Sequence, residues 1–442
     1  MSLLRLLPRF QRAEKAAQEL AARESLDRSA IQDWQLNAIN QMWRSATQNV
    51  PHYQQLHQDQ SLPTEFDSLD QYSSLISVLD KSYVRNHPER FHNSSAGPGR
   101  WLRSGGSTGT PMRIFWTHEA HLINLQTRYR WYHQWGFDAH DRQTFLWGHA
   151  GSFAPGLKGL FQKFKQPILD RLRSRQRLSA YRLSPADLDQ YIRKTQSFKP
   201  SSIYGYASAV ELLAKRCQET GETLRGLKAV LLTGEPAYAK SIAEIESILG
   251  CPAIREYGSV ETGIMANDHR DKTLRIREDR FFIESIPFTD DTYQIVVTNL
   301  INTGFPLFRY PIGDLCPAPL DRPAKGFAIL QQVLGRDNDF VVGKTGRLVH
   351  ANGVKHVFEQ VDAIRRFRVN QDETGFVTAQ LESHADSITS YELAGMQSAL
   401  EELLEGFEVK IEIVDALSGN RAGKHRWVTS AMRPDLTNQT CT

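Results

Sequence analysis

Short β-rich runs alternate with helical stretches between about residue 100 and residue 335, and this alternation restricts the fold more than any other feature of the sequence. The run AVLLT at 229–233 precedes the helical pattern AKSIAEIESILG at 239–250. Such alternation favours helices layered on a largely parallel sheet. The segment YQIVVTNL at 293–300 is more typical of an antiparallel strand. The sequence therefore predicts an α/β fold with layered mixed sheets and helices.

The length and a change of pattern near residue 335 indicate two domains. A chain of 442 residues exceeds the size at which a single core stops growing. After GRDND, shorter strand and helix patterns follow one another closely, including the helical pattern HVFEQVDAIRRF at 356–367. We therefore expect a large N-terminal domain with a helical lead-in, a hinge, and a small α+β C-terminal domain, over residues 1–335 (lead-in 1–60), 336–339 and 340–442.

Composition excludes several classes of protein. Lys and Arg number 53 against 50 Asp and Glu, so the formal charge of +3 gives no reason to expect nucleic-acid binding. The four cysteines form no C-x-x-C pair, which favours a reducing compartment over a disulfide or zinc framework. No apolar run reaches the length of a secretory or membrane-spanning segment. These features predict a soluble, cytoplasmic protein.

The segment SGGSTGTP is a candidate phosphate loop. Its three glycines leave backbone N–H groups free to surround an anion, and its hydroxyl groups add further donors. The loop does not fit G-x-x-x-x-G-K-[ST], and an extended segment follows it instead of a helix. An ordinary turn is the alternative interpretation. The residues proposed to contact ATP are Ser104, Gly105, Gly106, Ser107, Thr108, Gly109 and Thr110.

The segment REYGSVETG at 255–263 places an aromatic ring close to a carboxylate. Tyr257 has the chemistry to stack on adenine, and Glu261 the chemistry to hold Mg²⁺ against phosphate oxygens. The alternative interpretation is an ordinary strand-to-helix connection with Glu261 at the start of the helix.

Three later segments add candidate nucleotide contacts. In RYPIGDL, Asp314 follows a glycine and has the chemistry to accept hydrogen bonds from two ribose hydroxyls, unless it is only a turn aspartate. In LGRDND, Arg336 has the chemistry to contact ribose or phosphate. In GNRAGKHRWV, Lys424 lies in a loop flanked by glycines and is either a cation for the transition state or a solvated surface lysine.

The ordered set SGGSTGTP, TGEP, REYGSVETG, RYPIGD, GRDND and RAGKHR resembles the adenylate-forming superfamily of acyl-CoA synthetases, luciferases and peptide-synthetase adenylation domains. Within it, the chain looks most like the phenylacetate-CoA ligase branch, which includes capsular-polysaccharide-associated proteins and deazaflavin-adenylylating synthetases. The segments NVPHYQQL, LISVLDKSYVRNHPERF and FRVNQD carry the finer resemblance, which spans roughly residues 35 to 430.

The resemblance implies a role for each matching position. Lys424 and Glu261 are expected to be catalytic, with Glu261 the Mg²⁺ ligand, and the C-terminal domain is expected to be a mobile lid. Besides the phosphate loop, the expected ATP contacts are Gly234, Glu235, Glu256, Tyr257, Gly258, Ser259, Asp314 and Arg336. The expected substrate contacts are His149, Tyr204 and Gly205, although a buried structural histidine is an equal alternative for His149.

The implied activity is Mg²⁺- and ATP-dependent conversion of a small carboxylic acid to acyl-AMP with release of pyrophosphate. Acyl transfer would follow, to CoA, a carrier-protein thiol, an amine or a hydroxyl, in polysaccharide or natural-product biosynthesis. Two alternatives stay open: a nucleotidyltransferase that leaves AMP on its substrate, and a non-catalytic nucleotide-binding scaffold. The sequence identifies neither the acid nor the acceptor.

Residues 157–178 form a basic amphipathic segment. Seven Lys and Arg side chains face a single acid, Asp170, while leucine, isoleucine and phenylalanine recur at roughly helical spacing. A membrane surface, an acidic carrier protein or the phosphates of CoA would suit such a segment. A solvated surface helix is the favoured interpretation.

Overall fold

The computed structural model divides into two compact units, which comprise residues 1–312 with 316–333, and residues 313–315 with 334–442. The structure describes residues 11, 15, 20, 22–103, 112–138, 140–148, 169–180, 183–289, 292–336, 340–345, 348–350, 354, 357–358, 361, 363–364, 366–383, 388–417 and 427–432. Within these ranges, none of the helices combines the length and apolar character needed to span a bilayer. The predicted hinge at 336–339 lies largely outside the described residues.

An eight-stranded mixed sheet dominates the first unit, in the order β13-β9-β8-β7-β6-β5-β3-β4. Neighbouring strands from β4 to β7 run parallel, while β8, β9 and β13 pair antiparallel. This arrangement confirms the predicted α/β fold with a mixed sheet. The strands in sheet order are Ile329–Leu330, Leu274–Ile276, Gly263–Asp268, Ala253–Ser259, Ala229–Thr233, Ser202–Tyr206, Gln143–Trp147 and Arg175–Ser179.

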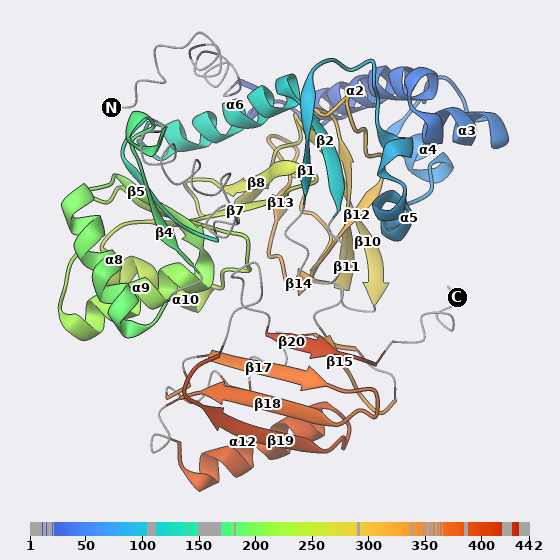
Figure 1. Ribbon diagram of the computed structural model, residues 1–442. Helices are drawn as coiled ribbons and strands as arrows, with labels where there is room; N and C mark the ends of the chain where they lie inside the picture. Colours follow the sequence, from blue (N-terminus) through green and yellow to red (C-terminus); the bar gives the residue numbers. More distant parts are fainter. Residues whose placement is uncertain are drawn as a thin grey trace, which may run out of the picture. The chain divides into compact units, whose positions relative to one another are not determined.

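Helices cover both faces of this sheet (Figure 1). The helices α8 (Pro185–Phe198), α9 (Ala207–Thr220) and α10 (Ala239–Leu249) pack on one face through aliphatic side chains. On the other face, α6 (His118–Gln134) contributes aromatic residues to a cluster with alternate residues of the same strands. Because side chains alternate along a strand, each strand supplies both layers.

The N-terminal helices form a second core around Trp43, with a second sheet and a hairpin. Pro51 ends α2 and occupies the first turn of α3, where its missing N–H costs nothing. The second sheet has the order β10-β11-β12-β14, and β1 pairs with β2. These elements are α2 Arg28–Asn49, α3 Pro51–Asp59, α4 Leu69–Leu75, α5 Lys81–Asn86, η2 Pro88–Phe91, β1 Gly99–Arg103, β2 Arg113–Thr117, β10 Phe281–Thr289, β11 Thr292–Asn299, β12 Tyr310–Cys316 and β14 Gly335–Arg336.

The second unit is an α+β domain with a four-stranded sheet in the order β19-β18-β17-β20 and one described helix against it, α12. Its elements are β15 Phe340–Val342, β16 Leu348–His350, β17 Arg366–Gln371, β18 Val377–Glu382, α12 Ser390–Leu403, β19 Val409–Val414 and β20 Val428–Ser430. The helix predicted at 356–367 extends too far, because strand β17 already begins at Arg366. Burial alternates along RFRVNQ with Phe367, Val369 and Gln371 inside, which is a strand period.

Candidate functional site

The segment REYGSVETG forms a tight hairpin between strands β7 and β8. Strand β7 ends at Ser259 and β8 begins at Gly263, so the strand-to-helix alternative is wrong. Gly258 is required here, because a Cβ atom would lie 2.2 Å from the carbonyl oxygen of Gly263. The indole of Trp116 donates a hydrogen bond of 3.0 Å to the carbonyl of Val260 and so fixes the turn.

Glu261 lies in this turn and is buried, with 8% of its surface exposed. The Ser259 hydroxyl accepts hydrogen bonds from the backbone N–H groups of Glu261 and Thr262, at 3.1 and 3.3 Å. No described residue bonds or ion-pairs with the Glu261 carboxylate itself. Its oxygens are not among the unpartnered side-chain atoms that are closed off from solvent, so the carboxylate is accessible to a cation. No cluster of three or more metal-ligating side chains occurs in the described part of the chain, so any such cation would take its other ligands from elsewhere.

A second buried carboxylate, Glu256, joins three strands of the sheet and helix α6. The Tyr204 hydroxyl of β5 donates to Glu256 Oε1 at 2.5 Å, and the Thr233 hydroxyl of β6 lies 3.3 Å from the same oxygen. Arg128 of α6 places Nη2 3.7 Å from Glu256 Oε2 and 3.5 Å from the Tyr204 oxygen. This network ties α6 to three neighbouring strands beside the hairpin.

The electrostatics of this network favour the protonated forms of Tyr204 and Arg128. Burial raises the pKa of Tyr204 well above its ordinary value, and the Glu256 charge raises it further, so Tyr204 stays a hydrogen-bond donor. Burial by itself would lower the pKa of Arg128, but Tyr204 and Glu256 together raise it above its ordinary value. Arg128 therefore remains a guanidinium cation beside the Glu256 carboxylate.

The segment TGEP lies between β6 and α10 and reaches α9. Gly234 has a φ of +76°, a backbone conformation that favours glycine. The Glu235 carboxylate accepts a hydrogen bond of 3.0 Å from the backbone N–H of Ser208. That N–H lies in the first turn of α9, where a negative charge is stabilised. Glu235 is thus held at a helix N-terminus.

Tyr204 and Gly205 are neighbours on β5 but point to opposite faces of the sheet. The Tyr204 ring belongs to the aromatic layer beneath α6. A Cβ atom on Gly205 would lie 2.8 Å from the Leu146 carbonyl oxygen and 3.1 Å from a Val210 methyl, so this glycine allows close packing on the other face. Of these two candidate substrate residues, only Tyr204 lies on the face of the sheet that carries Glu256.

The remaining candidates belong to other places or lie outside the described residues. Asp314 is buried on β12 in the second unit and lies opposite Arg336 of β14 in the strand register. The strands β1 and β2 pair antiparallel up to Arg103 and Arg113, so the predicted phosphate loop connects the two strands of a hairpin. Outside the described residues lie Ser104 to Thr110, His149, Lys424, the side chain of Arg336 and residues 157–168 of the basic segment.

Sequence reasoning missed a pocket beside the Glu256 network. Its volume is about 210 Å³, and Phe145, Trp147, Arg175, Arg177 and Tyr204 line it. The Arg175 guanidinium lies 4.8 Å from the centre of the Phe145 ring, and the rings of Trp147 and Tyr204 stack with centroids 5.6 Å apart. Tyr204 was expected to contact the substrate, and Arg175 and Arg177 belong to the basic segment, but no motif grouped these residues with Phe145 and Trp147 because they come from three separate strands. The strand patterns at 143–147 and 175–179 were the available signal.

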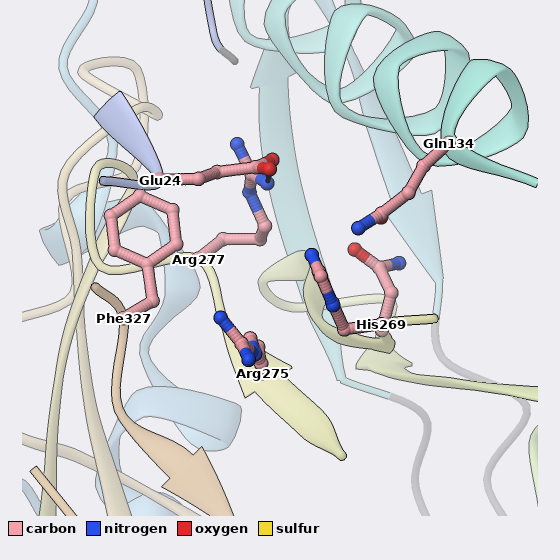
Figure 2. A pocket seen from close by; sticks show the side chains of 7 residues that line it. Glu24, Gln134, His269, Arg275, Arg277 and Phe327 are labelled. Atoms are coloured by element: carbon pink, nitrogen blue, oxygen red, sulfur yellow. Dashed lines mark hydrogen bonds and ion pairs between the residues drawn. The ribbon is translucent and has the colours of Figure 1, made fainter. Parts of the chain in front are cut away.

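A smaller pocket opens near the start of the chain (Figure 2). Figure 2 shows Glu24, Arg277 and Phe327 on one side of it, with Gln134 and His269 opposite. Arg277 donates to Glu24 at 2.6 Å, so the charges of this wall are paired. A volume of about 20 Å³ holds roughly one water molecule. This pocket is therefore too small for an organic substrate.

Comparison with solved structures defines the class of fold. Over 92% of the chain, the structure superposes with a TM-score of 0.70 on 91% of a 2-hydroxyisobutyryl-CoA ligase in the postadenylation state, bound to 2-HIB-AMP, at 15% identity. An open conformation of that ligase with 2-HIB-AMP and CoA gives a TM-score of 0.58 at 16% identity, covering 92% of this chain and 93% of the ligase. The chain therefore has the fold of the adenylate-forming ligases.

Two further similarities cover less of the chain. The anthranilate-CoA ligase AuaEII, in complex with anthranoyl-AMP, matches with a TM-score of 0.50 at 14% identity, covering 74% of this chain and 65% of that ligase. Protein CapK of Staphylococcus aureus is 24% identical over 278 residues, which is 61% of this chain but only 60% of that protein. No family model matches the sequence. The resemblance predicted from the motifs is confirmed at the level of the fold.

Proposed function

We propose that this protein activates a carboxylic acid with ATP, forming acyl-AMP and pyrophosphate, and then transfers the acyl group to an acceptor. The observation that carries the proposal is the buried Glu261 carboxylate, which no described residue pairs, in a YGSVE hairpin. Its setting supports the proposal, because 92% of the chain superposes on a ligase that was solved with 2-HIB-AMP.

In the first step, a carboxylate oxygen of the acid attacks the α-phosphorus of ATP. The bond from that phosphorus to the bridging oxygen breaks, and pyrophosphate leaves with the electron pair. In the second step, the acceptor attacks the acyl carbon, loses its proton, and AMP leaves. Neither step requires a nucleophilic side chain, so the protein contributes position and charge.

Glu261 suits a single protein contact to Mg²⁺. This ion commonly keeps several water ligands and binds one or two carboxylates together with substrate phosphates. A lone buried carboxylate fits that pattern better than a dedicated cage of ligands would. When bound, Mg²⁺ would neutralise charge on the phosphate oxygens. The Ser259 hydroxyl bonds the backbone of the turn and thereby holds the Glu261 main chain in place.

The finer assignments are proposals that extend this scheme. Ser104 to Thr110 would surround the phosphates, Tyr257 and the Gly234 turn would border adenine, and Lys424 would stabilise the transition state. CoA is one candidate acceptor, because a ligase of the same fold was solved with CoA. A carrier-protein thiol, an amine and a hydroxyl are the others. The phenylacetate-CoA ligase branch and a biosynthetic pathway also stay predictions.

The test is ATP–pyrophosphate exchange by the full chain with Mg²⁺ and a panel of aryl, fatty, hydroxy and amino acids. We expect one class of acid to stimulate exchange, and Glu261→Gln and Lys424→Ala to reduce it by about 100-fold or more, as the loss of preorganised charge stabilisation does in other enzymes.

Matched controls separate catalysis from folding. Glu211→Gln removes a carboxylate on α9 that pairs with Lys215 at the surface, and Lys410→Ala removes a lysine whose side chain is 62% exposed. Both variants should catalyse ATP–pyrophosphate exchange at the wild-type rate. ATP binding without exchange on any acid would overturn the proposal, and AMP retained in the product would replace it with nucleotidyl transfer.

A further inference from the structure

The pocket between β3, β4 and β5 combines aromatic walls with guanidinium groups. Phe145 and Trp147 come from β3, Arg175 and Arg177 from β4, and Tyr204 from β5. A cavity of about 150 Å³ is known to hold benzene, so the 210 Å³ of this pocket accommodate a substituted ring. The pocket is open on one side, so a ligand can enter it without rearranging the sheet.

The charges around the pocket do not cancel. Arg177 pairs with Asp170 at 3.1 Å, and the nearby Arg128 is compensated by Glu256. Arg175 contacts the face of the Phe145 ring, and no described residue gives it a hydrogen bond or an ion pair. Burial and the positive charge of Arg128 both lower the pKa of Arg175, which reflects a cation that lacks an anion. Among the described residues, the pocket therefore holds one positive charge without a counter-ion.

The positions of Arg175 and Glu256 relative to the pocket determine how a ligand would be oriented in it. Tyr204 is a shared wall, because its ring lines the pocket while its hydroxyl bonds Glu256 beside the YGSVE hairpin. Arg175 pairs in register with Gln143 at the beginning of β3, whereas Trp147 lies at the end of that strand. A ligand in the pocket would therefore have one end toward the hairpin and the other toward Arg175.

We propose that the acid activated by this protein is an aromatic carboxylic acid carrying a second negatively charged group, which Arg175 binds against the Phe145 ring. This inference rests on the proposed function, since it assigns the substrate class of the same site. Arg175 is then a specificity-determining residue. The reacting carboxylate points toward the hairpin, and the second anion fills the place of the missing counter-ion.

The experiment compares terephthalate and 4-sulfobenzoate, which carry two negative charges, with benzoate, which carries one. In ATP–pyrophosphate exchange we expect both dianions to exceed benzoate in kcat/KM. Arg175→Met should raise KM for the dianions by about 10- to 100-fold, the value of one charged hydrogen bond, and change the benzoate value less than about twofold. Arg175→Lys should retain part of the preference for the dianions over benzoate.

Two controls protect the interpretation. Arg216→Met removes an arginine that is paired with Asp189 on α8, beyond the opposite face of the sheet, and should leave all three acids unaffected. Thermal unfolding of each variant checks that the sheet is intact. Direct binding of terephthalate to the wild type and Arg175→Met, measured by calorimetry without ATP, gives a readout independent of catalysis.

The outcomes distinguish the two proposals. Exchange with benzoate at least as efficient as with the dianions, or dianion exchange unchanged in Arg175→Met, would overturn the substrate class and leave adenylation supported. Absence of exchange with every acid, combined with terephthalate binding that depends on Arg175, would support the anion pocket and contradict adenylation. Absence of both exchange and binding would overturn both.

Discussion

The two faces of the same parallel strands differ in chemistry. Toward α8, α9 and α10, the strands present Leu146, Ile203, Val230 and Leu232, all nearly inaccessible to solvent. Toward α6, alternate positions of the strands present the aromatic rings of Phe145 and Tyr204 beside small and aliphatic side chains and, in the middle of β7, Glu256. Along one strand, every second side chain therefore packs against α8, α9 and α10, and the side chains between them face the candidate site. The difference indicates that substitutions on the two faces should separate stability from substrate recognition.

Breaking the ion pair on the α6 face should have the largest effect on stability. Arg128→Met leaves the Glu256 carboxylate, whose side chain is 5% exposed, buried without its cation. Removing one partner of a buried pair typically lowers the free energy of unfolding by about 3–5 kcal/mol. Chemical denaturation of the wild type, Arg128→Met, Glu256→Gln and the double variant measures this loss. The double variant should be more stable than Arg128→Met alone, and additive losses would show that the two side chains are not coupled.

On the opposite face, Leu213→Ala should destabilise without altering the site. Leu213 of α9 is fully buried in the aliphatic cluster, and such a truncation costs about 2–5 kcal/mol. The KM values for ATP and for the acid should stay at the wild-type level when they are measured well below the unfolding temperature. A change of KM comparable to that of Arg175→Met would contradict the separation of the two faces.

Removing a single hydroxyl on the α6 face should have a smaller effect. Tyr204→Phe keeps the ring but deletes the 2.5 Å hydrogen bond to Glu256, at a cost of about 1–3 kcal/mol. The matched control is Tyr191→Phe on α8, which deletes a 3.0 Å bond to the Ser179 carbonyl. Both variants should lower the unfolding temperature, but only Tyr204→Phe should change kcat/KM for the acid. Equal kcat/KM values for the acid in the two variants would show that Tyr204 does not line the substrate site.

The smallest predicted effect concerns two thiols of the aliphatic face. Burial raises the pKa of Cys217 to about 11 and that of Cys251 to about 12, and nearby carboxylates add to the shift. At pH 8 both groups are therefore protonated and shielded, so iodoacetamide should modify them only after unfolding. Site-resolved mass spectrometry checks this expectation. Rapid labelling of either cysteine in the folded protein would contradict the close packing of that face.

The sequence predicted local elements well where one pattern was sufficient. AVLLT and the helix after it are confirmed as β6 and α10, because an apolar run of five residues and an amphipathic period are local signals. The hairpin at Ser259 was not predicted, since it depends on the close approach of Gly258 to the Gly263 backbone.

The chemistry of the α6 face was predictable only in part. Tyr204 and Glu256 were identified through the resemblance. Arg128 and Arg175 were not, because each acquires its meaning from residues on other elements. Charge compensation is a property of three-dimensional arrangement, so no spacing in the sequence marks which arginine lacks an anion.

Adenylation itself is tested most directly by following oxygen from the acid. The acid that best stimulates exchange is supplied with ¹⁸O in both carboxylate oxygens, and the AMP released after turnover is analysed by mass spectrometry. Attack of the carboxylate on the α-phosphorus predicts AMP that carries one ¹⁸O atom. Unlabelled AMP would show that water or another nucleophile attacks ATP, and it would contradict the formation of an acyl-AMP by this protein.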